Sequence, residues 1–94
     1  GPRPCRVLGA SLGQNIPNPF SNSTRIPYYL PEGFEKAEIL VTDLTGKKIS
    51  IYPLEENGHG ELEVNITALS AGVYPYFLLV DNVIVSSKEM MVAE

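Results

Sequence analysis

Residues 74–92 read YPYFLLVDNVIVSSKEMMV, two apolar runs on either side of a short polar dipeptide. Its first half places large apolar side chains at every second position: Tyr74, Tyr76, Leu78 and Val80. Phe77 and Leu79 make the other face apolar too, so we expect this strand to be covered on both sides or central in its sheet. The dipeptide DN then supplies a turn, and VIVSSKEMMV forms the final strand. The stretch therefore predicts a β-hairpin.

The same alternation appears in residues 23–30, upstream of this hairpin. Every second residue there belongs to one face of a strand, which holds Thr24, Ile26, Tyr28 and Leu30. Pro27 lies on the other face and has no N–H for a ladder hydrogen bond. This strand is therefore expected either to lie at a sheet edge or to be broken at Pro27.

The middle of the chain predicts two more strands and the turns around them. The strand of residues 37–42 ends at DLTGKK, where Asp43 and Gly46 suit a tight hairpin. Pro53 is expected to close the next strand, whose apolar face holds Ile49 and Ile51. EENGHG at 55–60 is expected to be a turn, after which Leu62, Val64 and Ile66 alternate. LSAGVY at 69–74 breaks the pattern, and Gly72 supplies a positive φ or room for a close approach before Tyr74.

These segments together predict the fold class. Six strands recur about every ten residues, which is typical of an antiparallel β-sandwich. A candidate seventh strand covers Val7 to Leu12. No segment keeps a helical period, so we expect an all-β domain.

The composition indicates one domain and excludes several partners. A chain of 94 residues with a hydrophobic share of 44% suffices for one core. The net charge of −4 leaves no basic surface for nucleic acid, and the longest apolar run, 77–80, is too short for membrane insertion. Gly1-Pro2 resembles the remnant of a cleaved fusion tag. We expect a linker in residues 3–14 and the domain in residues 15–94.

The sequence lacks the side-chain combinations typical of catalysis or metal binding. His59 is the single histidine and Cys5 the single cysteine, which does not support a catalytic triad or a cysteine metal cluster. Glu61 and Glu63 share a strand face, and a solvated surface explains them better than a calcium site. The tyrosines of GVYPYF favour core positions over a sugar-stacking platform, with hydroxyls reaching the sheet rim. We therefore expect no enzyme activity, no metal and no cofactor.

Four landmarks follow one another along the chain: LGQNIPNPFSNSTRIPYYLP, ILVTDLTGKKI, LSAGVYPYFL and SSKEMMV. Over about residues 12–92 they resemble the type A C-terminal sorting domain of type IX secretion cargo, the Por secretion system family. Members typically show QNxPNPF, xxDxxGxxV, LxxGxYxY and a final KKMxx strand. The chain departs from this pattern where Lys88-Glu89-Met90 replaces KKM, Ala93-Glu94 replaces a terminal lysine, and Pro75 interrupts GVYxY.

The resemblance implies an immunoglobulin-like sandwich at the end of a larger exported protein. Such a domain is expected to cross the periplasm and to meet the type IX outer-membrane translocon, shuttle and sortase proteins. Its upstream cargo then reaches the cell surface or the extracellular space. A surface sortase is expected to cut within residues 3–14 as the cargo is attached or released, because proteolysis favours mobile backbone. The sequence leaves the oligomeric state open.

The family motifs single out residues that shape the domain or are recognised: Pro17, Asn18, Pro19, Phe20, Asp43, Gly46, Gly72, Tyr74, Tyr76, Lys88, Met90 and Val92. In NIPNPF the prolines fix φ and set the path of the chain, and Phe20 is expected to plug the open end of the sandwich. The final strand offers an edge for strand addition with Lys88 setting the register, or it completes the sheet with Lys88 as an edge gatekeeper.

Two other functions stay open from the sequence. One is an extracellular adhesion or carbohydrate-binding sandwich, which predicts glycan affinity and secretion that does not depend on the domain. The other is a structural spacer that packs against its upstream domain through Val7, Leu8 and Phe20.

Overall fold

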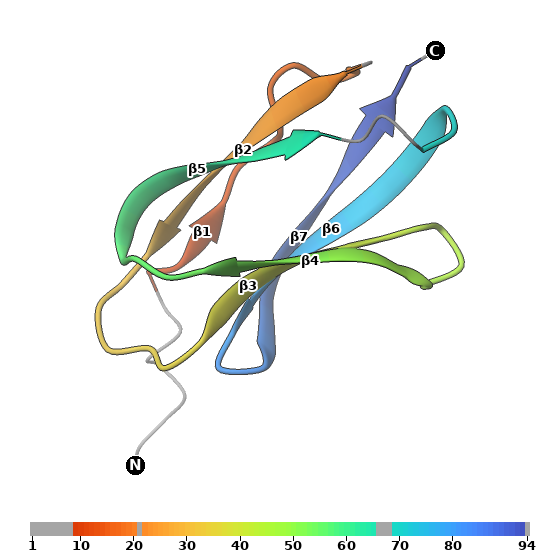
Figure 1. Ribbon diagram of the computed structural model, residues 1–94. Helices are drawn as coiled ribbons and strands as arrows, with labels where there is room; N and C mark the ends of the chain where they lie inside the picture. Colours follow the sequence, from red (N-terminus) through yellow and green to blue (C-terminus); the bar gives the residue numbers. More distant parts are fainter. Residues whose placement is uncertain (1–8, 21, 66–68, 94) are drawn as a thin grey trace.

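The computed structural model of the chain describes residues 9–20, 22–65 and 69–93. Those residues form seven strands and no helix, so no helix there could span a membrane. The strands are β1 (Ser11–Leu12), β2 (Ser23–Leu30), β3 (Ala37–Thr42), β4 (Lys48–Leu54), β5 (Gly58–Asn65), β6 (Gly72–Val80) and β7 (Val83–Val92). The expected all-β architecture is confirmed (Figure 1).

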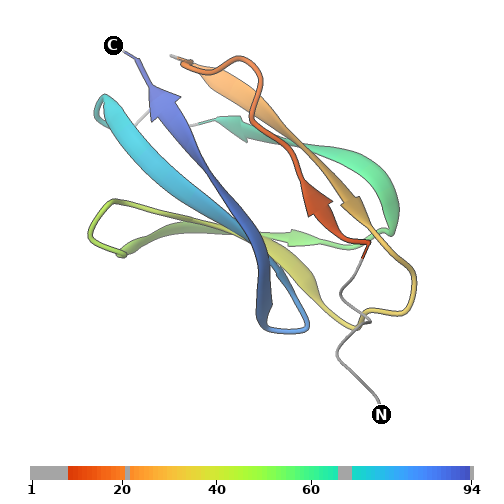
Figure 2. The same cartoon turned by 180° about the vertical axis from the view of Figure 1, so that it is seen from behind.

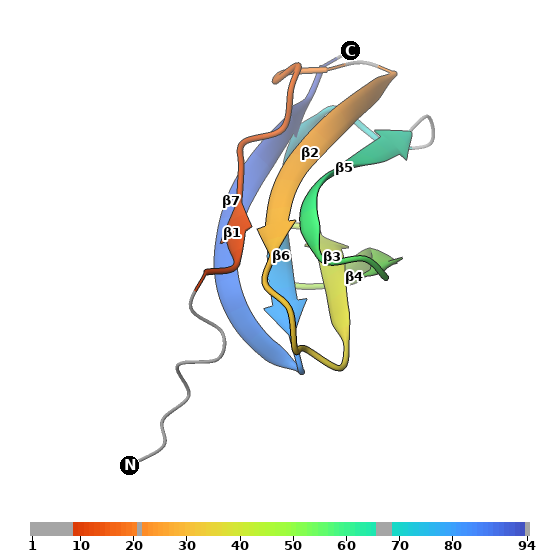
Figure 3. The ribbon, with the colours of Figure 1, turned by 90° about the vertical axis from the view of Figure 1, so that its left-hand side faces the viewer.

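The strands form two antiparallel sheets that pack face to face. One sheet has the order β1-β2-β5, and the other has the order β4-β3-β6-β7. The predicted hairpin of residues 74–92 corresponds to β6 and β7, with β6 inside the larger sheet and β7 at its edge. Viewed from the side, β1 and β7 lie along the same flank of the sandwich (Figure 3). This arrangement confirms the predicted sandwich and is consistent with an immunoglobulin-like fold.

The core lies between the two inner faces and follows the alternation of the sequence. Its fully buried apolar side chains come from both sheets: Ile26, Leu30, Ile39, Val41, Val64, Tyr76, Leu78 and Met90. Leu12 of β1 joins this cluster with 6% of its surface exposed, although it falls within the expected linker. The candidate seventh strand is thus reduced to Ser11–Leu12, while Val7 and Leu8 lie outside the described residues.

Two tight turns have the predicted chemistry. In the β3–β4 hairpin, one carboxylate oxygen of Asp43 accepts hydrogen bonds from the amide and hydroxyl of Thr45 and from the amide of Lys47. Gly46 has a φ of +92° there, which an L side chain rarely adopts. In the β6–β7 turn, Asp81 and Asn82 have φ values of 51° and 67°, as a two-residue hairpin requires. Both predicted hairpins are confirmed.

The predicted turn at residues 55–60 is wrong in its second half. β5 begins at Gly58, so Gly60 faces Tyr28 and His59 faces Tyr29 across the pair with β2. The rings of Tyr29 and His59 lie 4.8 Å apart on the outer face. The strand was not predicted because its glycines are typical of a turn. Gly60 is required in the strand because the ring of Tyr28 fills the space beside it: a ring carbon would lie 2.6 Å from an added Cβ.

The proline positions also differ from the expectation. Pro53 does not close its strand, since β4 continues to Leu54. β2 is not an edge strand but lies between β1 and β5. The strand is not broken at Pro27 either, since β2 runs from Ser23 to Leu30 and Pro27 stays paired with β5. On the β1 side the pairing ends beside Pro27, whose carbonyl accepts the Gly13 amide at 2.8 Å. The missing N–H of Pro27 points to that same side, because both backbone groups of a strand residue share one direction.

Candidate functional site

The most distinctive part of the molecule is residues 13–20, which we call the clasp. It passes from one sheet to the other along the β1 and β7 flank (Figure 2). At its start, Ile16 and Arg25 of β2 exchange two backbone hydrogen bonds of 2.8 and 2.9 Å. At its end, the amide of Phe20 donates to the carbonyl of Met91 at 3.0 Å, and the amide of Ala93 donates to the carbonyl of Phe20 at 2.7 Å. The clasp therefore ties the two sheets together.

β7 is the edge strand that the clasp covers. Successive residues of a strand direct their backbone groups to opposite sides. Met91 turns its amide and carbonyl to the free edge, where Asn18 and Phe20 bond them. Glu89 and Ser87, two and four positions before Met91, turn their backbone groups to the same side. The clasp thus occupies the C-terminal part of an edge that would otherwise be open.

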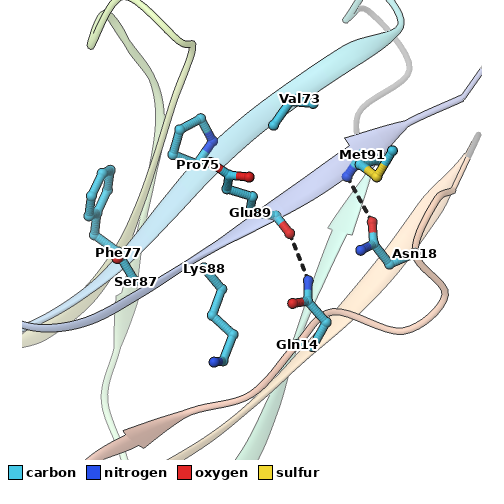
Figure 4. Close-up of a pocket in the computed structure, with 9 residues that line it drawn as sticks. All are labelled: Gln14, Asn18, Val73, Pro75, Phe77, Ser87, Lys88, Glu89 and Met91. Atoms are coloured by element: carbon cyan, nitrogen blue, oxygen red, sulfur yellow. Dashed lines mark hydrogen bonds between the residues drawn. The ribbon is translucent and has the colours of Figure 1, made fainter.

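Two amide side chains of the clasp make hydrogen bonds to the edge of β7 that the backbone of a neighbouring strand would otherwise make. Gln14 donates from Nε2 to the Glu89 carbonyl at 2.7 Å, and Asn18 accepts the Met91 amide on Oδ1 at 2.8 Å (Figure 4). Between Asn15 and Phe20 only Ile16 and Asn18 have a backbone N–H, because the other two residues are prolines. The peptide bonds before Pro17 and Pro19 are cis.

Asn15 holds the bend of the clasp and is missing from the residues that the sequence singled out. Only 1% of its surface is exposed. Its Nδ2 donates to the Pro17 carbonyl and to the Thr24 hydroxyl, each at 3.1 Å, and the Thr24 hydroxyl donates to the same carbonyl at 2.8 Å. The asparagine of the QNxPNPF motif was the available signal, but its burial depends on β2 and β6 and cannot be seen locally.

Tyr76 supports the clasp from beneath. It lies in β6 and is completely buried. Its hydroxyl donates to the Gly13 carbonyl at 2.7 Å and accepts the Asn15 amide at 2.9 Å. Burial raises the pKa of the Tyr76 phenol to about 12, although the hydrogen bond from Asn15 acts in the opposite direction. The predicted core position is therefore confirmed, and the hydroxyl binds the clasp backbone.

Phe20 closes the end of the sandwich, as the sequence predicted. Its side chain is 3% exposed and belongs to the core cluster. Phe20 and Val92 form a parallel bridge, and Val92 is itself 6% exposed. Met90, two residues earlier on the same face of β7, is completely buried. The aromatic anchor at the end of the clasp and the last inward residues of β7 therefore form one packed unit.

A groove of about 740 Å³ runs along the outer face of β6 and β7 beside the clasp (Figure 4). Its apolar lining comes from four side chains: Val73, Pro75, Phe77 and Met91. Gln14, Asn18 and Glu89 add polar groups to the same groove. The groove thus combines an apolar floor with the hydrogen-bonded seam between the clasp and β7.

Lys88 borders this groove from the edge of β7. It is half-buried and extends away from β6, on the side where the clasp passes (Figure 4). Among the described residues, Lys36 and Glu38 form the one ion pair, at 4.0 Å, so no acidic side chain there pairs with Lys88.

The other predicted residues lie apart from the seam. Asp43 and Gly46 belong to the hairpin that leads into β4, the opposite edge of the sheet. Tyr74 is half-buried and donates its hydroxyl to the Ser70 carbonyl at 2.8 Å. Gly72 begins β6 with a φ of +157°, so the expected positive φ is confirmed. The alternative of a close approach is not observed, since the nearest atom to an added Cβ would be 3.9 Å away. No cluster of metal-binding side chains is present in the described part of the chain.

Comparison with known proteins identifies the family. Residues 15–93 match the family described as the secretion system C-terminal sorting domain, Por_Secre_tail. The matched segment contains the clasp from Asn15 onward and all of β7, the two parts that form the seam. No curated protein and no solved structure showed significant similarity. The chain therefore belongs to the type IX secretion C-terminal sorting domains, which direct their cargo across the outer membrane to the cell surface or the extracellular space.

Proposed function

We propose that the type IX machinery recognises the seam between the clasp and β7 as one surface. The observation that supports this is the hydrogen bond from the Met91 amide to Asn18 Oδ1 at 2.8 Å, which joins residues 73 positions apart. The bond unites the first and the last of the four sequence landmarks. A receptor that contacts both segments then distinguishes the folded domain from an unfolded chain.

The chemistry of the seam suits an extended strand of the receptor. Within the described residues, the clasp bonds Met91 and the Glu89 carbonyl but makes no bond to the outward backbone groups of Ser87. An added strand would use these open groups, as in β-augmentation. Lys88 would pair with an acidic side chain of that strand, and the groove beside it would accept an apolar side chain.

The remaining steps concern proteins that act on this domain. The cargo enters the periplasm, the shuttle and translocon proteins bind the domain, and a surface sortase removes it. We expect the cut within residues 3–10, because Ser11 and Leu12 pair with β2 and Gly13 bonds Pro27. The domain is in this scheme a signal and a substrate, and it catalyses no reaction itself.

A reporter assay tests the recognition surface. The chain is fused to a periplasmic reporter in a bacterium with type IX secretion, and Ser87→Pro removes one outward N–H from the open part of β7. Glu63→Pro is the matched control, because Glu63 turns its N–H to the free edge of β5 in the other sheet. We expect Ser87→Pro to retain the reporter in the periplasm while Glu63→Pro secretes it, with both variants folded by circular dichroism.

Two results would contradict the proposal. Equal secretion of the two variants would show that the open edge of β7 is not read. Glycan binding by the domain, together with full secretion after its removal, would instead support the adhesion module.

A further inference from the structure

The opposite edge of the four-stranded sheet has no covering segment among the described residues. β4 forms this edge and pairs only with β3. The carbonyl of Lys36 accepts a hydrogen bond from the Asp81 amide, so Lys36 directs its backbone groups toward β6. Backbone direction alternates along a strand, and Ile39, three positions later, therefore directs its amide and carbonyl toward β4. Tyr52, opposite Ile39, therefore directs its backbone groups toward β3, and Ile51 directs its amide and carbonyl toward the free edge of β4.

Ile51 is the centre of this open edge. Its side chain is 47% exposed, and it lies beside Leu40 on the outer face of the sheet. Pro53, the next outward residue, has a carbonyl but no N–H to offer. The open ladder around Ile51 is consequently short, and any strand that adds here would bind weakly.

The charges along this edge have opposite signs at its two ends. Residues 47–56 read KKISIYPLEE, with Lys47 and Lys48 at one end and Glu55 and Glu56 at the other. All four side chains are exposed, and none of them belongs to the one ion pair of the described residues. The segment is therefore complementary to an antiparallel copy of itself, whereas a parallel copy would place like charges together.

We propose that a second copy of this chain pairs antiparallel with β4 about a two-fold axis at Ile51. The two Ile51 residues exchange both N–H···O bonds, and the lysines of each copy lie beside the glutamates of the other. The two four-stranded sheets then form one continuous sheet. This surface is separate from the seam at β7, so its loss leaves recognition by the secretion machinery unchanged.

Charge exchange gives a direct test by sedimentation equilibrium. We expect the wild-type chain to dimerise reversibly below about 1 mM, since interfaces of small area bind weakly. Lys47→Glu/Lys48→Glu and Glu55→Lys/Glu56→Lys should each weaken dimerisation at least about tenfold, because attraction becomes repulsion. An equimolar mixture of the two variants should restore association, because both pairs of ends are then complementary. High salt should weaken the wild-type and the mixed dimers alike.

A second pair of variants tests the position of the axis. Ile51→Lys places two like charges at the centre and should leave a monomer, while Ile84→Lys should dimerise like the wild type. Ile84 is the matched control because it is also an exposed outer-face residue, at 59%, but on β7. A wild-type chain that stays monomeric at about 1 mM, or variants that fail to associate when mixed, would overturn the proposal.

Discussion

The two edges of the four-stranded sheet are finished in different ways. At β7 the chain returns from its N-terminal side, and the clasp bonds residues 89–93 through a backbone bridge and two side-chain amides. At β4, no other described segment bonds the edge, which carries Pro53 and flanking charges. An edge covered by the chain's own clasp holds a fixed surface, which suits a signal read by a receptor. An edge that is protected only by a proline and charges of its own strand keeps unpaired backbone groups that another strand can bond.

Removing the aromatic anchor of the clasp should have the largest effect on the covered edge. Phe20→Ala should lower the free energy of unfolding by about 3–5 kcal/mol, since a buried aromatic ring leaves a cavity in the core. Chemical denaturation with circular dichroism measures the change. Ile16→Ala is the control from the same segment, because Ile16 is 67% exposed, and it should change stability by less than about 0.5 kcal/mol.

Similar losses for the two variants would contradict the packing described for Phe20. They would mean that the clasp contributes through its backbone path and not through its aromatic anchor. Secretion of the reporter should follow the same order, with Phe20→Ala the more impaired.

The hydroxyl of Tyr76 joins the clasp to β6, the strand beside the covered edge, and its removal should have the next largest effect on stability. Tyr76→Phe should cost about 1–3 kcal/mol, because the Gly13 carbonyl and the Asn15 amide lose their buried partner. The folded chain keeps the phenol proton up to a pKa of about 12, above the ordinary value of 10.0. The contribution of the hydroxyl is therefore complete below pH 10 and is lost as the pH rises toward 12.

Stability curves at several pH values check this sign. The difference in the free energy of unfolding between wild type and Tyr76→Phe should be constant from neutral pH to about 9 and should shrink above that. A gap that widens with rising pH would show that the phenolate, not the phenol, is the stabilising form.

Much of the fold could be predicted because alternation and turn chemistry are local. The strands of residues 74–92, and the turns at Asp43–Gly46 and Asp81–Asn82, follow from side-chain order alone. The start of β5 could not be predicted, because its glycine-rich sequence has the composition of a turn and only the ring of Tyr28 explains Gly60. Local sequence shows which residues favour a strand, but not what fills the space beside them.

The candidate site was only partly predictable for the same reason. The motif residues Pro17, Phe20 and Met90 could be named, and the terminal strand could be expected at an edge, which the sheet order confirms. The covering of that edge could not be predicted, since Asn18 and Met91 are 73 residues apart in the sequence and only the three-dimensional fold brings them together. The roles of these residues in recognition remain predictions.

Hydrogen exchange measures the protection of each edge at individual amides. The Met91 amide is bonded to Asn18 and should exchange more slowly than the Ile51 amide, which faces the open edge. Asn18→Ala should speed exchange at Met91 and lower stability by about 0.5–1.5 kcal/mol, the usual worth of one hydrogen bond. Exchange at Ile51 is the internal control and should not change, measured by NMR on dilute protein. Equal rates for both amides in the wild type would show that the clasp does not protect β7.

The smallest effect concerns the turn that leads into the open edge. The hydroxyl of Thr45 and the amide of Lys47 donate to Asp43 and hold the pKa of its carboxyl below the ordinary value of 3.8. A depressed pKa stabilises the fold above that ordinary value, and the contribution is lost as the pH falls through the folded value. Asp43→Asn should therefore lower the melting temperature slightly at neutral pH, and the difference should disappear under strongly acidic conditions. The amide resonances of Thr45 and Lys47 should shift over the same acidic range, while the Met91 amide stays unchanged. A shift at Met91 would mean that the two edges respond to one another, and the contrast between a locally finished edge and a clasped one would then fail.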